Sequence, residues 1–174
     1  MKILMVIAPH DFRDEEFFQP KDIFEKAGFA VVIASKGVKT SKGVMGGITP
    51  VDKELDQINV NDYGGVIFVG GPGSAVYFHD QEALNLAKMT LQNQKLLGAI
   101  CIAPSILANA GLLEGKKATC FSSEAEHLKA KGAVYTGQDV TIDDEDDKIV
   151  TAFGPQAAQK FGQTIVNLLK KPLA

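Results

Sequence analysis

The sequence is poor in cysteine, in net charge and in long apolar runs. Its 174 residues include two cysteines, Cys101 and Cys120. Two cysteines are too few for the disulfide framework of a secreted domain and lack the paired spacing of a metal site, so a reducing cytoplasm is the expected compartment. A formal net charge of −3 gives no electrostatic reason to expect a nucleic-acid or anionic-membrane partner. No apolar run reaches the length of a membrane span, which leaves small molecules and proteins as partners.

What the sequence does contain is typical of a globular protein, with 45% hydrophobic and 22% charged residues. The length suits one domain over residues 1–174 that buries about 70% of the surface of its unfolded chain. The first residues, MKILMVIAPHDF, are interpreted as a strand and not as a targeting segment, because they run into acidic sequence without a cleavage region. We find no internal repeat, low-complexity segment or linker.

Short apolar runs alternate with segments of helical spacing along the chain. The runs predict strands at residues 2–8, 29–35, 64–71, 95–100 and 117–121. Helices are predicted at residues 14–28, 80–94, 103–113, 123–132 and 155–171, and hairpins at residues 36–55 and 139–152. Strands separated by helices indicate βαβ units. We therefore predict an α/β fold, a single-domain sandwich with a mostly parallel central sheet flanked by helices on both faces.

Ligand sites in such sheets lie beyond the carboxyl ends of the strands. The candidate residues are therefore those that directly follow a predicted strand, namely residues 10–16, 70–74, 101–104, 121–123 and 154–155. Among them, the GGPG stretch at residues 70–73 offers backbone amides to an oxyanion or a phosphate. It lacks the lysine of a P-loop and the spacing of a dinucleotide fingerprint, so no nucleotide is implied.

Cys101 is the most informative of these residues. It follows a predicted strand and precedes a helix that carries Pro104 in its first turn. Ala99 and Ala103 lie two residues to either side, which is the small-residue pattern that a tight strand-to-helix elbow requires. Such an elbow directs helix amides at the sulfur and is expected to lower the thiol pKa. The alternative, that Cys101 is a small buried hydrophobe as most free cysteines are, remains open.

Two kinds of side chain are candidates to assist the thiol. Helical register places Glu16 on the inner side of the first helix more readily than Glu15, where burial would raise its pKa and let it donate a hydrogen bond to the sulfur. His10 lies just past the first strand, on the site face, and is a candidate for the pocket lining. His127 falls in a polar helix and is expected to be a solvated surface residue.

Four motifs occur in the order DEEFFQP, FVGGPG, AICIAP and TAFGP. In this order, over nearly the whole chain, they resemble the ThiJ/PfpI superfamily, which includes the parkinsonism-associated deglycase and the archaeal intracellular proteases. The resemblance implies a flavodoxin-like, class I glutamine amidotransferase-like fold. It also implies roles for the matching residues: Cys101 as the reactive elbow cysteine, Glu16 as the protonated partner of that sulfur, Gly71 and the Ile102 amide as the oxyanion hole, and Gly154 and Pro155 as a turn near the pocket.

The chain departs from the family at two positions. Ile102 stands where the protease-like branch has histidine directly after the cysteine, and Phe121 stands where the parkinsonism-associated protein has a histidine. Ile102 disfavours proteolysis and favours the glyoxalase, deglycase or sensor version of the family's chemistry. With both histidines replaced, general-base chemistry must come from Glu16, a water or the substrate. The expected function is therefore a cysteine-dependent enzyme acting on small 2-oxoaldehydes or their adducts, with Cys101 as nucleophile and Glu16 as proton shuttle.

This expected enzyme needs no metal and no organic cofactor, takes a small carbonyl substrate and, like its superfamily, forms a homodimer or a higher homo-oligomer. Two alternatives stay open. One is a redox-sensing, chaperone-like stress protein that uses oxidation of Cys101. The other is an intracellular cysteine peptidase.

Overall fold

The computed structural model describes residues 1–143 and 145–171. The described residues form the helices α1 (Asp14–Lys26), α2 (Gln81–Gln92), α3 (Pro104–Asn109), α4 (Ala125–Ala130) and α5 (Ala158–Lys170). The central sheet contains β1 (Lys2–Val6), β3 (Ala30–Ser35), β6 (Lys53–Glu54), β7 (Gly65–Phe68), β8 (Leu96–Ile100), β11 (Val140–Ile142) and β12 (Ile149–Ala152). Two smaller sheets contain β2 (His10–Phe12), β4 (Thr40–Gly43) and β5 (Ile48–Pro50), and β9 (Lys117–Ala118) and β10 (Val134–Tyr135).

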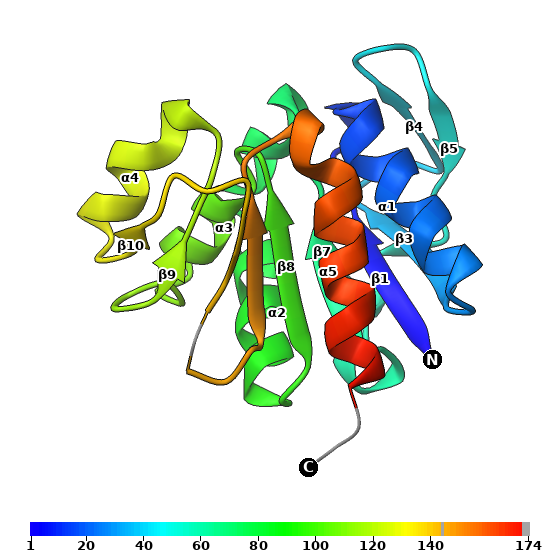
Figure 1. Ribbon diagram of the computed structural model, residues 1–174. Coiled ribbons are helices and arrows are strands. Elements are labelled where there is room, and N and C mark those ends of the chain that lie inside the picture. The colour runs from blue at the N-terminus through cyan, green and yellow to red at the C-terminus, as the bar shows by residue number, and fades with distance from the viewer. Residues whose placement is uncertain (144, 172–174) are drawn as a thin grey trace.

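The central sheet has the strand order β11-β12-β8-β7-β1-β3-β6. Its neighbouring strands are parallel except for the antiparallel pair of β11 and β12. Helices α1 and α5 cover one face of this sheet, while α2 and α3 cover the other (Figure 1). The predicted fold class, an α/β sandwich with a mostly parallel central sheet flanked by helices on both faces, is confirmed.

Strand β1 explains why the sheet is buried on both faces. Successive side chains of a strand point to opposite faces, and β1 is apolar at each of its buried positions. Leu4 and Val6 join the core beneath α2 and α3, whereas Ile3 and Met5 join the core beneath α1 and α5. A strand that is covered on both sides needs such a continuous apolar run.

Helices α1 and α5 approach each other closely at Pro20 and Gly162. A Cβ atom at Gly162 would lie 3.0 Å from the Cα of Pro20, so glycine allows this contact. Pro20 lies inside α1 and has no N–H to donate to the carbonyl of Glu16, one turn earlier. Glu16, one turn before Pro20, therefore lies on the helix that packs closely against α5.

The structure differs from the sequence-based expectation in two places. The hairpin predicted in residues 36–55 forms as β4 and β5, but β2 also pairs with β4, in parallel; the predicted first strand ended at residue 8, so β2 was not expected. The predicted strand at residues 117–121 is limited to β9, which pairs with β10 outside the central sheet. None of the helices in the described part of the chain has the length and hydropathy needed to cross a membrane.

Candidate active site

Strands β1, β7, β8 and β12 run in parallel, so their carboxyl ends lie along one edge of the central sheet. A cavity of about 370 Å³ opens at this edge. Its lining consists of Arg13, Glu16, Gly71, Pro72, Cys101, Ile102, Phe121, Ser123 and Pro155. A larger hollow of about 590 Å³ lies between α1 and α5, but in the described residues its lining has neither cysteine nor histidine. The cavity at the strand ends is therefore the candidate active site.

Cys101 sits at a sharp turn between β8 and α3. Its backbone has φ of 65°, in the left-handed region that side chains rarely adopt. Two hydrogen bonds hold this conformation: its N–H donates to the Ala152 carbonyl at 3.0 Å, and its carbonyl accepts from the Phe121 N–H at 2.9 Å. The flanking Ala99 and Ala103 are fully buried. The turn has the strained geometry of a nucleophile elbow, as the small flanking residues predict.

Glu16 lies in the first turn of α1 with its side chain fully buried. Neither carboxyl oxygen has a hydrogen-bond partner of normal geometry among the described residues. The Cys101 thiol and the Gly70 amide stabilise the ionised carboxylate only weakly and so lower its pKa less than burial raises it. Glu15, by contrast, points outward and pairs with Arg13. The prediction that Glu16 and not Glu15 faces the inner side is confirmed.

Gly70 makes room for this carboxyl and thiol to meet. A Cβ atom at Gly70 would come into collision with Glu16 Oε2 and would lie 2.5 Å from the Cβ of Cys101. Gly71 is required for a different reason: its φ is 100°, and a Cβ there would lie 2.7 Å from the carbonyl oxygen of Asp11. Only glycine can therefore occupy positions 70 and 71 without moving the neighbouring atoms.

The backbone amides of Gly71 and Ile102 both stabilise negative charge on the Cys101 sulfur. They come from different elements, since Gly71 follows β7 and Ile102 precedes α3. Two amides that converge on one point from separate loops can also hold the oxyanion that forms when the thiol attacks a carbonyl. These are the two positions that the family resemblance implies for an oxyanion hole.

Burial dominates the proton affinity of Glu16 and Cys101. Desolvation raises the pKa of Glu16 to about 8, against the opposing effects of the Cys101 thiol and the Arg13 charge. Desolvation, followed by the charge of Glu16, raises the pKa of Cys101 to about 12, against the amides of Gly71 and Ile102. The raised pKa predicted for Glu16 is confirmed, but the lowered thiol pKa is wrong. Near neutral pH Glu16 holds a proton, and the pair carries at most one negative charge.

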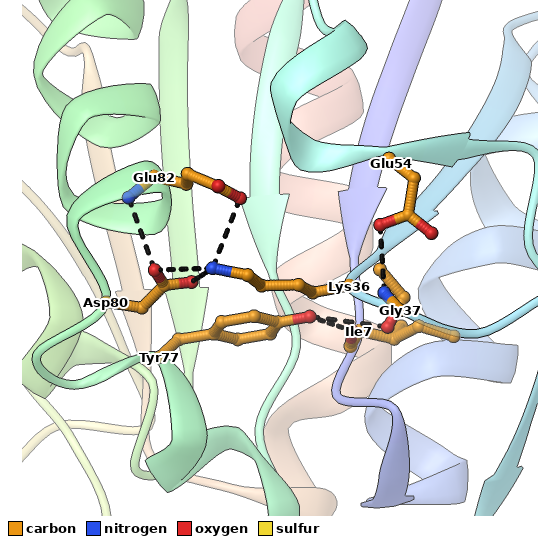
Figure 2. A network of polar contacts seen from close by, with 8 residues as sticks. Ile7, Lys36, Gly37, Glu54, Tyr77, Asp80 and Glu82 are labelled. Carbon is orange, nitrogen blue, oxygen red and sulfur yellow. Dashed lines mark hydrogen bonds and ion pairs between the residues drawn. The ribbon is translucent and has the colours of Figure 1, made fainter.

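A polar network connects the segment that follows Gly71 to the ends of β1 and β3 (Figure 2). The buried Tyr77 hydroxyl donates a 2.8 Å hydrogen bond to the Ile7 carbonyl, just beyond β1, and lies 3.3 Å from the Ser35 hydroxyl. Nearer the surface, Lys36 Nζ lies 2.9 Å from Asp80 Oδ1. The exposed ion pair contributes little to stability. The buried Tyr77 bond fixes the 3-10 helix at Pro72–Tyr77 to the end of β1.

Two of the predicted pocket residues do not line the cavity. His10 is exposed on β2, and Gly154 lies behind Phe121, where an added Cβ would be 3.5 Å from the Phe121 ring. His127 is also not the solvated residue that we expected, because it is half-buried and its Nε2 lies 2.6 Å from Asn109 Oδ1. Within the described residues the cavity lining contains no histidine.

Several lining residues received no role from the sequence. Arg13 and Ser123 fall within the segments that follow predicted strands, and Phe121 was noted only as a replacement for histidine. No local pattern distinguishes Arg13 from a surface cation, although it is the single arginine of the chain. Its position in the cavity depends on the contact with Glu15, in which Arg13 Nε lies 2.8 Å from Glu15 Oε2.

Known relatives share the sequence over almost its full length. An uncharacterized protein of Methanocaldococcus jannaschii is 39% identical over 173 residues, which cover 98% of this chain and 83% of that protein. A protein named protein/nucleic acid deglycase 2, from Escherichia coli, is 28% identical and covers 97% of this chain and 98% of its own. A Caenorhabditis elegans protein named glutathione-independent glyoxalase DJR-1.2 is 25% identical, with coverages of 97% and 89%.

The fold has a close counterpart among solved structures. The ThiJ/PfpI domain protein from Brachyspira murdochii superposes with a TM-score of 0.95 at 33% identity, covering 99% of this chain and 98% of that one. The family model described as the DJ-1/PfpI family matches residues 1–168. With the elbow cysteine and the buried glutamate in one cavity, and with this match over most of the sequence, the chain belongs to the DJ-1/PfpI family.

Proposed function

We propose that this protein is a cysteine-dependent enzyme that converts small 2-oxoaldehydes, or their adducts, to 2-hydroxy acids. The observation that carries the proposal is the buried Glu16 carboxyl, whose two oxygens lack full hydrogen-bond partners in the described residues and which shares a cavity with Cys101. A buried carboxyl without partners is costly. Such a cost is typical of a group that exchanges protons with a substrate.

In the first step, Cys101 attacks the aldehyde carbon. Because the pKa of Glu16 is raised to about 8, a fraction of this carboxyl is ionised near neutral pH and accepts the thiol proton as the C–S bond forms. The carbonyl π electrons move onto oxygen, and the amides of Gly71 and Ile102 stabilise the resulting alkoxide. Glu16 then returns the proton to this oxygen, which gives a neutral hemithioacetal.

In the second step, Glu16 carries a proton between neighbouring carbons. The carboxylate removes the hydrogen of the hemithioacetal carbon as a proton, giving an enediolate with its negative charge on the former ketone oxygen. The proton of the hemithioacetal hydroxyl moves to that oxygen, and Glu16 returns its proton to the carbon that was the ketone, so that the carbonyl of the thioester forms. The product is a thioester of the 2-hydroxy acid on Cys101. Water then adds to the thioester, the C–S bond breaks, and the sulfur recovers its proton. The net reaction adds one water and consumes no oxidant or reductant.

Deglycation uses the same first intermediate. An adduct of the 2-oxoaldehyde with an amine or a thiol presents the same carbon to Cys101, and the amine or thiol leaves with a proton as the C–S bond forms. The name deglycase of the 28% identical Escherichia coli relative and the name glyoxalase of the Caenorhabditis elegans relative support this pair of related reactions for the present chain.

The test is lactate formation from methylglyoxal by the wild type and by Cys101→Ala and Glu16→Gln. We expect the rate of Cys101→Ala to fall to background and that of Glu16→Gln to fall by about 100- to 10,000-fold, the usual contribution of general acid–base catalysis. Cys120→Ala is the matched control, because Cys120 is the second cysteine and does not line the cavity. A Cys101→Ala protein with the wild-type rate would exclude the mechanism.

A redox-sensing role is the second candidate. It is favoured by the access of Cys101 to the cavity beside a carboxyl that is free to bond an oxidised sulfur, whereas Cys120 is fully buried. We expect mild peroxide to oxidise Cys101 in preference to Cys120, measured by mass spectrometry; equal oxidation of the two thiols would remove this role. A peptidase is the least favoured function, because Ile102 stands where the protease-like branch has the histidine that follows the cysteine. Its test is incubation of the purified protein with unstructured peptides; absence of cleavage would exclude it.

A further inference from the structure

Among the described residues that line the cavity, Arg13 is the one basic side chain and Glu16 is the one acidic side chain. It precedes α1, and its side chain is about one-third exposed. The walls around it are contributed largely by Pro72, Ile102 and Phe121. A cation beside mostly apolar walls attracts an anion that enters the cavity, because the apolar side chains offer such an anion no competing polar contact.

The guanidinium of Arg13 is fixed in orientation by Glu15, which does not line the cavity. Arg13 Nε donates to Glu15 Oε2 at 2.8 Å, and Nη2 donates to Glu15 Oε1 at 3.2 Å. A guanidinium has five N–H donors, so three have no partner among the described residues: both on Nη1 and one on Nη2. The carboxylate behind Arg13 therefore holds the group without using all of its donors.

We propose that Arg13 determines substrate specificity by binding a carboxylate, so that the preferred substrate is a 2-oxoaldehyde with a carboxylate at the end remote from the aldehyde. This inference rests on the proposed function and names its substrate class. The planar guanidinium binds carboxylates through paired, charge-assisted hydrogen bonds. The carboxylate takes no part in the bond changes: the aldehyde end reacts at Cys101 as described above, and the product is a 2-hydroxy dicarboxylate.

The test compares 4,5-dioxopentanoate with its methyl ester, which has the same reactive end and no charge. For the wild type we expect kcat/KM to favour the carboxylate by about 10- to 100-fold, the range for one charge-assisted contact. Arg13→Gln should reduce this ratio to near one. Arg13→Lys should give an intermediate ratio, because it keeps the charge and loses the planar fork. Lys21→Gln should keep the wild-type ratio, because Lys21 pairs with Glu25 outside the cavity.

A second measurement separates this inference from the proposed function. Calorimetric titration of both compounds into Cys101→Ser reports binding without turnover, and the same titration into the double variant with Arg13→Gln reports the contribution of Arg13. If the wild type converts neither these compounds nor methylglyoxal, the proposed function fails, and the binding preference alone decides the role of Arg13. Equal binding of the acid and the ester, or a preference that persists without Arg13, would overturn the inference.

Discussion

Glu16 should make the stability of the protein fall with pH, and Glu16→Gln should abolish that fall. The carboxyl is fully buried without full hydrogen-bond partners among the described residues, and burial raises its pKa from 4.5 to about 8. Between these two values the folded protein keeps a proton that the unfolded chain has lost. The stability linked to this proton is fully present below pH 4.5 and is lost as the pH rises through 8.

The size of the effect follows from one proton over this window. Each pH unit within it removes about 1.4 kcal/mol from the free energy of unfolding. The Glu16 contribution therefore falls by about 3 kcal/mol between pH 4.5 and 7, and by about 4 kcal/mol between pH 4.5 and 9. Glutamine has the same shape and does not titrate. Relative to the wild type, Glu16→Gln should gain stability as the pH rises, although it loses activity.

Urea denaturation of the wild type and Glu16→Gln at pH 5, 6, 7 and 8 measures this difference. We expect the two free energies of unfolding to diverge by about 1.4 kcal/mol per pH unit over this range, with equal m-values. Glu15→Gln is the matched control, because Glu15 is partly exposed and its pKa is lowered by Arg13. Parallel pH profiles for the wild type and Glu16→Gln would refute the assignment of a raised pKa to this carboxyl.

Three further predictions concern the geometry of the cavity. The kcat/KM for methylglyoxal should rise with pH up to about 8 as Glu16 loses its proton; a flat pH–rate profile contradicts Glu16 as the base. Gly71→Ala should lower kcat by about 100-fold or more, because its Cβ would collide with backbone and displace the oxyanion amide; steady-state kinetics with unchanged kcat would remove that amide from the mechanism. Tyr77→Phe should lower the free energy of unfolding by about 1–3 kcal/mol, because it leaves the Ile7 carbonyl without its donor; an unchanged urea midpoint would show that this bond does not anchor the segment.

The parts of the site that could be predicted from sequence depend on local patterns. The elbow at Cys101 was predictable because Ala99, Ala103 and Pro104 mark a strand that turns tightly into a helix. The inward orientation of Glu16 was predictable because helical register fixes which side chains face the sheet. The mostly parallel sheet followed from the alternation of apolar runs with helical spacing.

The parts that could not be predicted depend on contacts between distant segments. The prediction of a lowered thiol pKa was wrong because the sequence does not show how far burial of the sulfur, followed by the charge of Glu16, outweighs the helix amides. Strand β2 was missed because three residues, His10–Phe12, pair with β4 only in the folded chain. His127 was taken as solvated because its hydrogen-bond partner Asn109 lies on another helix.

The most direct test of the central claim is covalent capture of the substrate on Cys101. Wild type, Cys101→Ala and Glu16→Gln are mixed with methylglyoxal, quenched in acid and digested, and the peptide containing residue 101 is examined by mass spectrometry. The mechanism predicts an adduct with the mass of one methylglyoxal on Cys101 of the wild type, the 2-hydroxyacyl thioester, and much less of it in Glu16→Gln, because Glu16 takes part in both steps that form the thioester. Modification confined to lysine and arginine, with the Cys101 thiol unmodified in both proteins, would contradict the assignment of Cys101 as the nucleophile.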